Sequence, residues 1–445
     1  KSTRGMADYE MNEEPEGEQI RISLVLAQTC QDRSLEVPSD PIAVPSSTRK
    51  KGLSAIINHL LDRRVSNDKV NEDDDSAASD DDEDKLPSIP FDFLMSNKLL
   101  RMSVEAAARR EGLSLEQAVE IQYFPARLAP EGEGESESLP DWISAMSSSS
   151  GLLCTGNCDG SIRLFTADED DFGQSDVVKA HSGPVKCISS SSLPDNSDLT
   201  MIASGCMDQT LVTHTYAKGG KMALHAVYSG GHFSSINSVK LLKDDKQLTM
   251  ASADWDGGLC LWKVPTAVSD IKEPRGKRRK GSSIESAEVK EVSPYFSFKV
   301  HSNNVSGIAW SYESSNTLIT SSWDHSIKTW DVESQNNILT LNGSKVVTCL
   351  GRCHNSDVVA TGHPDCSVRL WDMRSSSKNE GKVFDNTLRP SHKSWISGVE
   401  WSPVDPYVLA SSSHDGSIKI WDIRSSIPLH TVQAHAKGSK ALCLS

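Results

Sequence analysis

The sequence predicts a mainly β protein in which a propeller of radially packed sheets follows a smaller N-terminal domain. Three observations lead to this prediction. A strand-turn-strand unit recurs from about residue 150, its copies are regularly spaced, and the segment before residue 129 has a different order of elements. The 445 residues are enough for two or three domains.

Each copy of the repeated unit has an Asp-led turn and then an alternating strand that mostly ends in an aromatic residue. The copies span 158–165, 207–214, 255–262, 323–330, 364–371 and 414–421, with turn aspartates Asp159, Asp208, Asp256, Asp324, Asp365 and Asp415. By subtraction, these aspartates are 49, 48, 68, 41 and 50 residues apart. A period of about 40–45 residues with an upstream His and a terminal Trp-Asp is typical of WD repeats. We therefore predict a WD-repeat β-propeller over residues 139–445.

The histidines upstream of the copies are His181, His232, His301, His392 and His435. Three copies depart from the pattern. The first lacks a clear upstream His, His214 replaces the terminal Trp of the second, and Asn342-Gly343 stands where the fifth needs its His. Six copies are complete and His435 opens another, so we expect seven blades with the last one incomplete. The segment 125–130 is a candidate for the strand that closes the ring.

The recurring His, Asp and Trp residues predict structural hydrogen-bond networks, because a catalytic set is expected once and not in several repeats. We find no Gly-rich phosphate loop and no cluster with metal-ligand spacing. The pairs Cys154/Cys158 and Cys349/Cys353 have three intervening residues, not the two typical of zinc sites. We therefore expect no enzyme activity, no small-molecule substrate, no cofactor and no intrinsic metal.

The formal net charge is −15, and much of it lies in runs at 72–75, 80–84 and 131–137. This acidity argues against a chain that clamps a nucleic-acid duplex. It also predicts disorder in an insertion at 63–87 and an acidic linker at 129–138, beside a disordered tail at 1–18. No stretch of about 18 apolar residues is present, so we expect no membrane span.

The N-terminal domain, 19–128, alternates between strand and helix patterns. We expect strands at 20–26, 42–44, 91–95, 98–102 and 119–124, a helix at 54–61, and a second helix that Ser103 caps and that runs to Arg110. This order is that of a ubiquitin-like β-grasp domain. No Gly-Gly end follows it, so we predict a docking module and not a conjugated tag.

Three segments, 52–61 (GLSAIINHLL), 90–105 (PFDFLMSNKLLRMSVE) and 111–124 (EGLSLEQAVEIQYF), precede the WD propeller. Together they closely resemble the family of WD repeat-containing protein twelve, called YTM in yeasts. The likeness covers nearly the whole chain and is weakest in the acidic insertion. The ubiquitin-like segments are its specific part, since WD propellers occur in many unrelated proteins.

The resemblance implies a non-catalytic assembly factor for the large (60S) ribosomal subunit, acting in precursor-rRNA processing in the nucleolus and nucleoplasm. Its partners would be the block-of-proliferation and pescadillo proteins of the PeBoW complex, on the pre-60S particle. The ubiquitin-like domain would dock on the MIDAS domain of midasin, an AAA ATPase that removes the factor from the particle.

The resemblance also singles out Glu116. In the family, a glutamate in the loop after the second helix completes the metal shell of the MIDAS, and Glu116 stands at the matching position. Mg²⁺ prefers hard oxygen ligands, and a partner's carboxylate can fill an open position. The metal would belong to the partner.

A basic insertion loop is expected at 265–294. It carries Arg275, Lys277, Arg278, Arg279 and Lys280, which fit a nuclear-import signal, a contact with pre-ribosomal RNA or a solvated loop. In the acidic insertion, Ser76 and Ser79 precede carboxylates and are candidate sites for an acidophilic kinase.

One rival function comes from Trp371-Asp372-Met373-Arg374 and Trp421-Asp422-Ile423-Arg424. Both resemble the WDxR box of cullin-4 ubiquitin-ligase substrate receptors. The box is short and common in WD proteins, and its Arg can also pair with a carboxylate of the blade.

Overall fold

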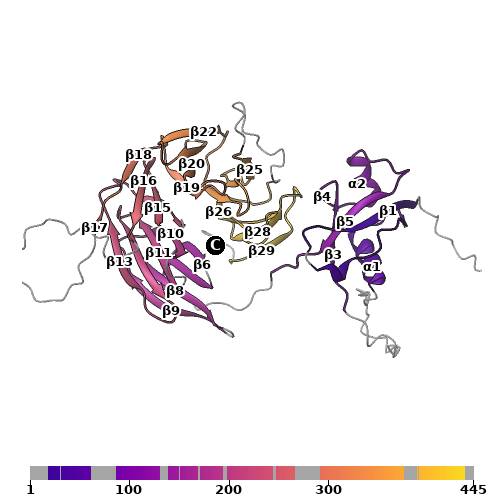
Figure 1. Ribbon diagram of the computed structural model, residues 1–445, viewed down its shortest axis with the longest axis horizontal. Coiled ribbons are helices and arrows are strands. Elements are labelled where there is room, and N and C mark those ends of the chain that lie inside the picture. The colour runs from indigo at the N-terminus through magenta and orange to yellow at the C-terminus, as the bar shows by residue number, and fades with distance from the viewer. Residues whose placement is uncertain are drawn as a thin grey trace, which may run out of the picture. The chain divides into compact units, whose positions relative to one another are not determined.

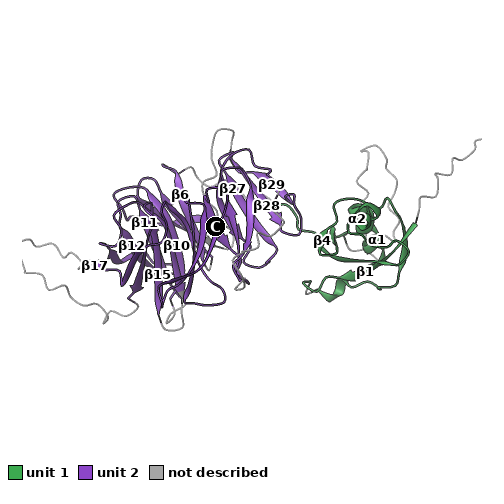
Figure 2. Cartoon of the chain, turned by 90° about the horizontal axis from the view of Figure 1, so that it is seen from above, with its two compact units in different colours: residues 1–132 green, residues 133–445 purple. Residues whose placement is uncertain are grey.

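The computed structural model describes residues 19–30, 32–61, 87–130, 139–149, 151–168, 171–193, 198–243, 247–265, 291–374, 388 and 390–435. The chain divides into two compact units, residues 1–132 and residues 133–445 (Figure 2). The predicted tail 1–18, nearly all of the acidic insertion and most of the linker lie outside the described residues.

Unit 1 is built on one mixed sheet with the strand order β2-β1-β5-β3-β4. Its strands are β1 (Gln19–Leu26), β2 (Ile42–Pro45), β3 (Phe91–Met95), β4 (Lys98–Leu99) and β5 (Val119–Pro125). The first and last strands, β1 and β5, pair in parallel at the centre, and the other pairs are antiparallel. This is the topology of a β-grasp domain, as the sequence predicted.

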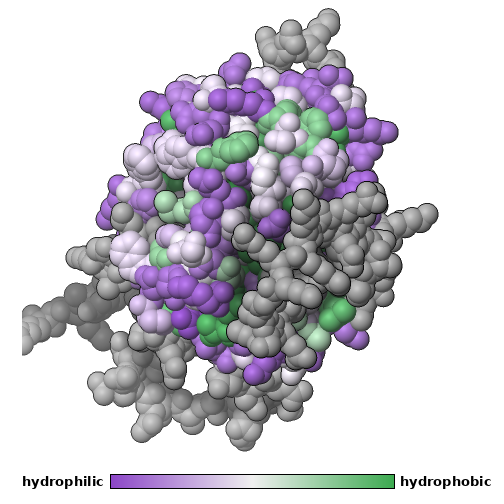
Figure 3. All heavy atoms as spheres, turned by 90° about the vertical axis from the view of Figure 1, so that its left-hand side faces the viewer, coloured by the Kyte–Doolittle hydropathy of each residue, from purple (hydrophilic) through white to green (hydrophobic). Residues whose placement is uncertain are grey.

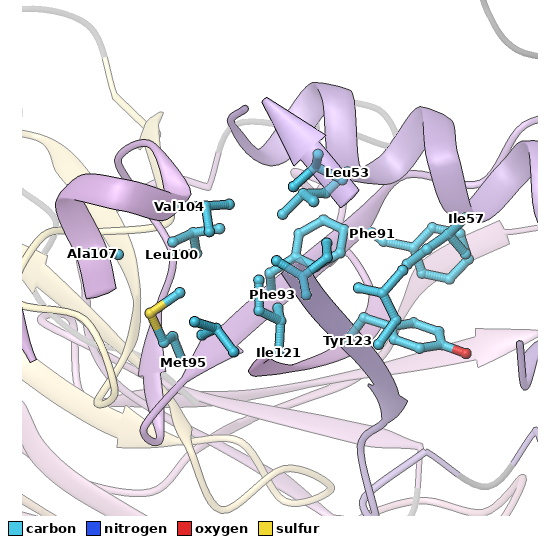
Figure 4. Close-up of a cluster of buried hydrophobic side chains, with 14 of the residues drawn as sticks. Leu53, Ile57, Phe91, Phe93, Met95, Leu100, Val104, Ala107, Ile121 and Tyr123 are labelled. Carbon is cyan, nitrogen blue, oxygen red and sulfur yellow. The ribbon is translucent and has the colours of Figure 1, made fainter. Parts of the chain in front are cut away.

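The helices of unit 1 are α1 (Lys50–Leu60), α2 (Val104–Arg110) and a short 3-10 helix, η1 (Arg33–Leu35). Leu53 and Ile57 of α1 and Val104 of α2 reach into a core with Phe93 and Ile121 of the sheet (Figure 4). Burial of such side chains is the main stabilising contribution, about 1.5–3 kcal/mol each.

Two predicted elements of unit 1 differ from the observed ones. The first helix begins at Lys50 and not at Ser54. The periodicity of apolar residues does not indicate this earlier start, because the first turn carries two lysines and Gly52. The strand expected at 98–102 ends at Leu99. The backbone N–H of Leu100 bonds back to the carbonyl of Phe93, so the chain leaves the sheet there.

Unit 2 consists of consecutive β-sheets, and six of them lie within its described residues. We number them blade 1 to blade 6 in chain order. Blade 1 contains β6 (Ile143–Ser149), β7 (Leu152–Asn157), β8 (Ser161–Asp168) and β9 (Asp171–Lys179). Blade 2 contains β10 (Val185–Ser192), β11 (Leu199–Cys206), β12 (Leu211–Ala217) and β13 (Ala223–Tyr228).

The later blades follow the same antiparallel order. Blade 3 contains β14 (Ile236–Lys243), β15 (Leu248–Asp254), β16 (Gly258–Val264) and β18 (Phe296–Lys299). Blade 4 contains β19 (Val305–Trp310), β20 (Thr317–Ser322), β21 (Ser326–Asp331) and β22 (Asn336–Asn342). Blade 5 contains β23 (Cys349–Arg352), β24 (Val358–Gly362) and β25 (Val368–Asp372), and blade 6 contains β26 (Ile396–Trp401), β27 (Val408–Ser413), β28 (Ser417–Asp422) and β29 (His430–Gln433).

The first strand of each blade packs against the first strand of the next, from β6 through β10, β14, β19 and β23 to β26. Figure 1 shows the blades following one another in this order. Blades 2 to 5 each lie between two neighbouring sheets, which is how a propeller buries both faces of a sheet. The predicted WD-repeat architecture is therefore confirmed. The expected seventh blade would involve residues after His435, which lie outside the described ones, so the blade count stays a prediction.

Two sequence predictions about loops are wrong. The predicted loop 265–294 contains a strand, β17 (Glu291–Val292), which pairs in parallel with β13 at the edge of blade 2. The segment 125–130 does not contribute a strand to the propeller. Pro125 ends β5 in unit 1, and residues 126–130 form no strand.

Candidate functional site

The loop that connects α2 to β5 carries the predicted site residue Glu116. Its start is held by a Schellman motif at the end of α2. The N–H of Leu113 bonds to the carbonyl of Ala108 at 2.9 Å, and the N–H of Gly112 bonds to the carbonyl of Arg109 at 3.2 Å. Gly112 has φ +70°, a left-handed conformation that favours glycine. The helix end therefore sets the direction in which the loop leaves.

The rest of the loop places Glu116 outward. Leu115 packs against the hydrophobic core of unit 1, and Val119 begins β5 in a buried position. Between these two anchors, Glu116 is exposed. The Ser114 hydroxyl accepts the backbone N–H of Glu116 at 3.3 Å, which stabilises the turn. The carboxylate of Glu116 makes no hydrogen bond or ion pair with the described part of the chain, so the exposed side chain is available to a partner.

A cavity of about 390 Å³ lies beside the loop. Its lining comes from the loop, from the turn between β3 and β4, and from β5. The lining residues are Leu94, Ser96, Asn97, Leu113, Ser114, Gln117, Ala118, Val119, Glu120 and Gln122. Ser96 and Asn97 both have positive φ, as in a tight hairpin turn. An exposed carboxylate beside a preformed hollow is suited to contact a partner. No sequence pattern indicates the hollow.

The histidines of three blades form complete hydrogen-bond networks inside unit 2. In blade 3, His232 is bonded through Nδ1 to Asp254 at 2.8 Å and through Nε2 to Ser252 at 2.7 Å, and Trp262 donates to Ser252 at 2.7 Å. His301 and His392 have equivalent partners in blades 4 and 6. These repeated, buried sets are structural, as the sequence predicted.

In blade 3, the aspartate that holds the histidine is Asp254 and not the turn residue Asp256. Burial would lower the pKa of His232, but its bonds to Asp254 and Cys260 outweigh this and raise the pKa to about 9. Burial keeps the pKa of His181, His301 and His392 below the usual value. Blade 3 therefore contains a charged His–Asp pair, and these other blades contain a neutral imidazole.

Blade 5 shows how a degenerate repeat keeps its network. It has no upstream histidine, and His363 from the end of β24 supplies the ring instead. Its Nε2 lies 2.9 Å from the Thr361 hydroxyl, which also accepts the indole N–H of Trp371 at 2.7 Å. Its Nδ1 lies 2.8 Å from the carbonyl of Val346. Sequence reasoning missed His363. Its position was a usable signal, because it stands two residues before the turn aspartate Asp365, just as Asp254 stands two residues before Asp256.

Blade 2 holds the one group among the described residues whose geometry suits a metal ion. His181, Cys206 and Asp208 each bring a ligand atom within 4.8 Å of the others. These atoms already have partners in the chain. Nδ1 of His181 lies 3.2 Å from the Thr210 hydroxyl, and the Cys206 sulfur accepts the N–H of Asp208. The three side chains thus form hydrogen bonds within the blade and make up a variant of the structural network seen in the other blades.

The arginines of the two WDxR-like boxes fold back on the boxes themselves. Arg374 makes two bonds to Asp372, at 2.9 and 2.8 Å, and Arg424 makes two to Asp422, at 2.9 and 2.6 Å. Arg424 also lies over the ring of Tyr407. The structure gives both arginines the role of pairing with a carboxylate of the blade.

The remaining predicted sites fall mostly outside the described residues. Arg275, Lys277, Arg278, Arg279 and Lys280 lie there, as do Ser76 and Ser79. The cysteines of the two close pairs are free thiols. Burial raises the pKa of Cys154 and Cys349 to about 12, which makes both thiols unreactive. Within the described ranges, helices are too short or too polar to cross a bilayer.

Comparisons with known proteins agree with both units. A family model described as NLE (NUC135) domain matches residues 20–108. The model described as WD domain, G-beta repeat matches residues 173–212, 224–263, 292–331, 335–372 and 384–422. The matched WD segments end within the third strands of blades 2 to 6, so they follow the sheets described above.

Whole-length relatives carry the name ribosome biogenesis protein WDR12 homolog. The chain is 32% identical to the Chlamydomonas reinhardtii protein, over 92% of this chain and 88% of the relative. It is 29% identical to the Arabidopsis thaliana protein, over 91% and 88%. It is 30% identical to the Nematostella vectensis protein, over 80% and 83%. With such identity across most of both chains and with matching domains in the same order, the chain belongs to the WDR12 family of ribosome biogenesis proteins.

Proposed function

We propose that this chain is a non-catalytic assembly factor of the 60S subunit whose propeller is held in the PeBoW complex and whose ubiquitin-like unit docks on midasin. The block-of-proliferation and pescadillo proteins are the proposed partners of the propeller. The proposal rests on the family and on one observation in unit 1, which is the exposed Glu116 carboxylate on an anchored loop.

The chemistry of Glu116 fits a metal contact in trans. A carboxylate oxygen is a preferred ligand of Mg²⁺, and an ion with an open coordination position accepts one from a partner. The anchored Leu115 and the Schellman motif at Gly112 reduce the conformational freedom that docking would otherwise remove. The hollow beside the loop offers room for a partner side chain. The metal belongs to the MIDAS of midasin, and ATP-driven pulling would then release the factor.

The test measures binding of the full chain to a midasin MIDAS fragment with and without Mg²⁺. Glu116→Gln should lower the affinity at least tenfold and abolish the Mg²⁺ dependence. Glu36→Gln is the matched control, because it neutralises another exposed carboxylate of unit 1, at the end of η1 and outside the lining of the hollow. Unchanged binding by Glu116→Gln, or an equal loss with the control, would exclude Glu116 as the metal contact.

The division of labour between the units has its own test. Removing residues 1–128 should leave co-purification with the block-of-proliferation and pescadillo proteins intact and should eliminate midasin. Loss of both sets of partners would contradict the assignment of PeBoW assembly to the propeller.

We further propose that the chain accumulates in the nucleolus and nucleoplasm and that the basic run 275–280 is its import signal. Deleting 275–280 should shift a fluorescently tagged chain to the cytoplasm. Unchanged nuclear accumulation would leave an rRNA contact or a plain solvated loop as the alternative role of this run.

We also propose Ser76 and Ser79 as sites for an acidophilic kinase. Mass spectrometry of the purified chain tests this proposal by detecting phosphate on these serines.

A further inference from the structure

Three consecutive blades carry an apolar side chain directly before an aspartate, at the same end of their sheets, and this side chain is exposed in blades 2 and 3 and half-buried in blade 4. The pairs are Met207-Asp208 in blade 2, Trp255-Asp256 in blade 3 and Trp323-Asp324 in blade 4. Each pair lies in the turn between the second and third strands. We name these six residues and Phe233 the Trp-Asp patch.

Backbone contacts place the pairs at one end of the propeller. The N–H of Trp255 bonds to the carbonyl of Ser235, just before β14, and the N–H of Trp323 bonds to that of Asn304, just before β19. The side chain of Asn237 on β14 donates to Asn304 at 2.7 Å, so these strand starts are level across the blade boundary. The rings of Trp255 and Trp323 then meet edge to face at 4.9 Å.

The patch is unusual in its exposure. Phe233, in the loop that enters β14, is 84% exposed, Met207 is 48% exposed and Trp255 is 44% exposed. The side of the molecule drawn in Figure 3 is largely hydrophilic, with hydrophobic surface in separate spots. Exposed aromatic side chains of this size, gathered over neighbouring elements, are typical of binding surfaces.

The charge of the patch is negative. Asp208 and Asp324 contact His181 and His301, whose pKa is lowered by burial, so the imidazoles are neutral and do not cancel the carboxylates. In blade 3, the charged His232 is matched by Asp254, and within the described ranges no ion pair is formed by the exposed Asp256.

The other blades have basic residues close to their turn aspartates or exposed aromatic side chains. Asp159 in blade 1 lies 3.6 Å from Arg163, and Asp365 in blade 5 lies 2.6 Å from Arg369. In blade 6, the exposed Trp395 stands two residues after the exposed Lys393. Lys299 lies at the same end as the patch, on the outer strand β18, but no ion pair joins it to the three patch aspartates among the described residues. The turn aspartate of blade 6, Asp415, interacts electrostatically with Lys419. No ion pair joins a patch aspartate to a Lys or Arg within the described part of the chain, so we take the uncompensated negative charge to be concentrated on blades 2 to 4.

We propose that the Trp-Asp patch binds a basic, arginine-bearing segment of a protein partner. A guanidinium stacks on the face of Trp better than on other aromatics and pairs with a nearby carboxylate in two hydrogen bonds. The adjacent Trp255 and Asp256 offer both contacts to one side chain. Nucleic acid is disfavoured, because its phosphates would meet the exposed carboxylate of Asp256 and the negative charges of Asp208 and Asp324, which are largely buried beside it. The proposal concerns the propeller alone and is independent of docking by unit 1.

The test titrates the full chain into three fluorescent probes and follows polarization. The probes are a twelve-residue Arg-Gly peptide, a Glu-Gly peptide of the same length and a single-stranded oligouridylate. We expect binding of the arginine peptide only, weakened by salt. Trp255→Ala should reduce this affinity about tenfold, and Asp256→Lys should eliminate it. Trp395→Ala is the control, since it removes an exposed tryptophan next to a lysine, and should have no effect.

A melting curve of each variant shows whether it is folded. We expect melting temperatures close to that of the wild type, because Trp255 and Asp256 are exposed. Binding of the glutamate peptide or the RNA in preference to the arginine peptide would overturn the proposal. Equal losses from Trp255→Ala and Trp395→Ala would also overturn it, because the contact would then not be confined to blades 2 to 4. The proposal is also overturned if the polarization of the arginine peptide stays unchanged up to a roughly 100-fold excess of the chain over the probe.

Discussion

Nδ1 of His232 lies 2.8 Å from Oδ2 of Asp254, two residues before the turn aspartate of the repeat. The pair is buried, and the same histidine is bonded on its other side to Ser252. The His301–Asp324 contact in blade 4 is nearly as short, 2.9 Å, but burial lowers the pKa of His301, whereas the bonds of His232 raise its pKa to about 9. Blade 3 is therefore the place where protonation of a histidine is most closely linked to stability.

The first prediction concerns pH. Because the pKa of His232 rises from 6.5 to about 9 on folding, its contribution to stability is fully present below pH 6.5 and is lost as the pH rises through 9. Asp254→Asn should remove this contribution and lower the free energy of unfolding by about 3 kcal/mol at pH 6.5. Urea denaturation at pH 6.5 and 9.5 measures it, and the wild type and variant should converge at the higher pH.

The control for this prediction is Asp256→Asn, which neutralises the next aspartate but touches no histidine. Its effect should stay within about 0.5 kcal/mol at both pH values, as for other surface substitutions. A loss as large as that of Asp254→Asn would mean that the turn aspartate, and not Asp254, holds His232.

The second prediction concerns the substituted network of blade 5. Thr361→Val removes one hydroxyl that serves both the indole of Trp371 and the ring of His363. Leaving two buried polar groups without a partner should cost about 2–4 kcal/mol in the free energy of unfolding. Thr340→Val, which removes an exposed hydroxyl of β22 bonded to Asn337, is the matched control and should cost under about 0.5 kcal/mol. Similar values for the two variants would show that His363 does not form the network.

The third prediction concerns the core of unit 1. The Tyr123 hydroxyl donates to the carbonyl of Leu35 at 2.8 Å and accepts the N–H of Val37 at 2.9 Å. These bonds attach the segment around η1 to β5. Tyr123→Phe should lower the stability of unit 1 by about 1–3 kcal/mol, since both backbone groups lose a buried partner. The unit's calorimetric transition measures the loss, and hydrogen exchange at Val37 should accelerate. An unchanged exchange rate would contradict the role given to the hydroxyl.

The fourth prediction concerns the loop that presents Glu116. A Cβ on Gly112 would meet nothing within 4 Å, so the cost of Gly112→Ala comes from its positive φ alone, about 1 kcal/mol. Gly112→Asn should cost less, because Asn tolerates this conformation. The melting temperature of unit 1 ranks the two variants. If the loop geometry also matters for docking, midasin affinity should fall in the same order. The opposite order would exclude backbone strain as the cause.

Much of the fold could be read from local patterns. The alternating strands, the Ser103 cap and the Asp-led turns are short-range features, and the elements they predict are observed with nearly the same bounds. The first turn of α1 was missed because Lys50 and Lys51 bear no apolar signal, and β17 because two residues are too few to show a period.

For the candidate site, local patterns alone place Glu116 in a loop after a capped helix and predict a His-Asp-Trp set in three of the repeats. Which groups meet depends on the tertiary structure. It paired His232 with Asp254, gave blade 5 its ring from His363, and aligned Trp255 with Trp323 from neighbouring blades. The reason is that strand pairing and the register of neighbouring blades bring together residues far apart in the chain, and no local pattern encodes those distances.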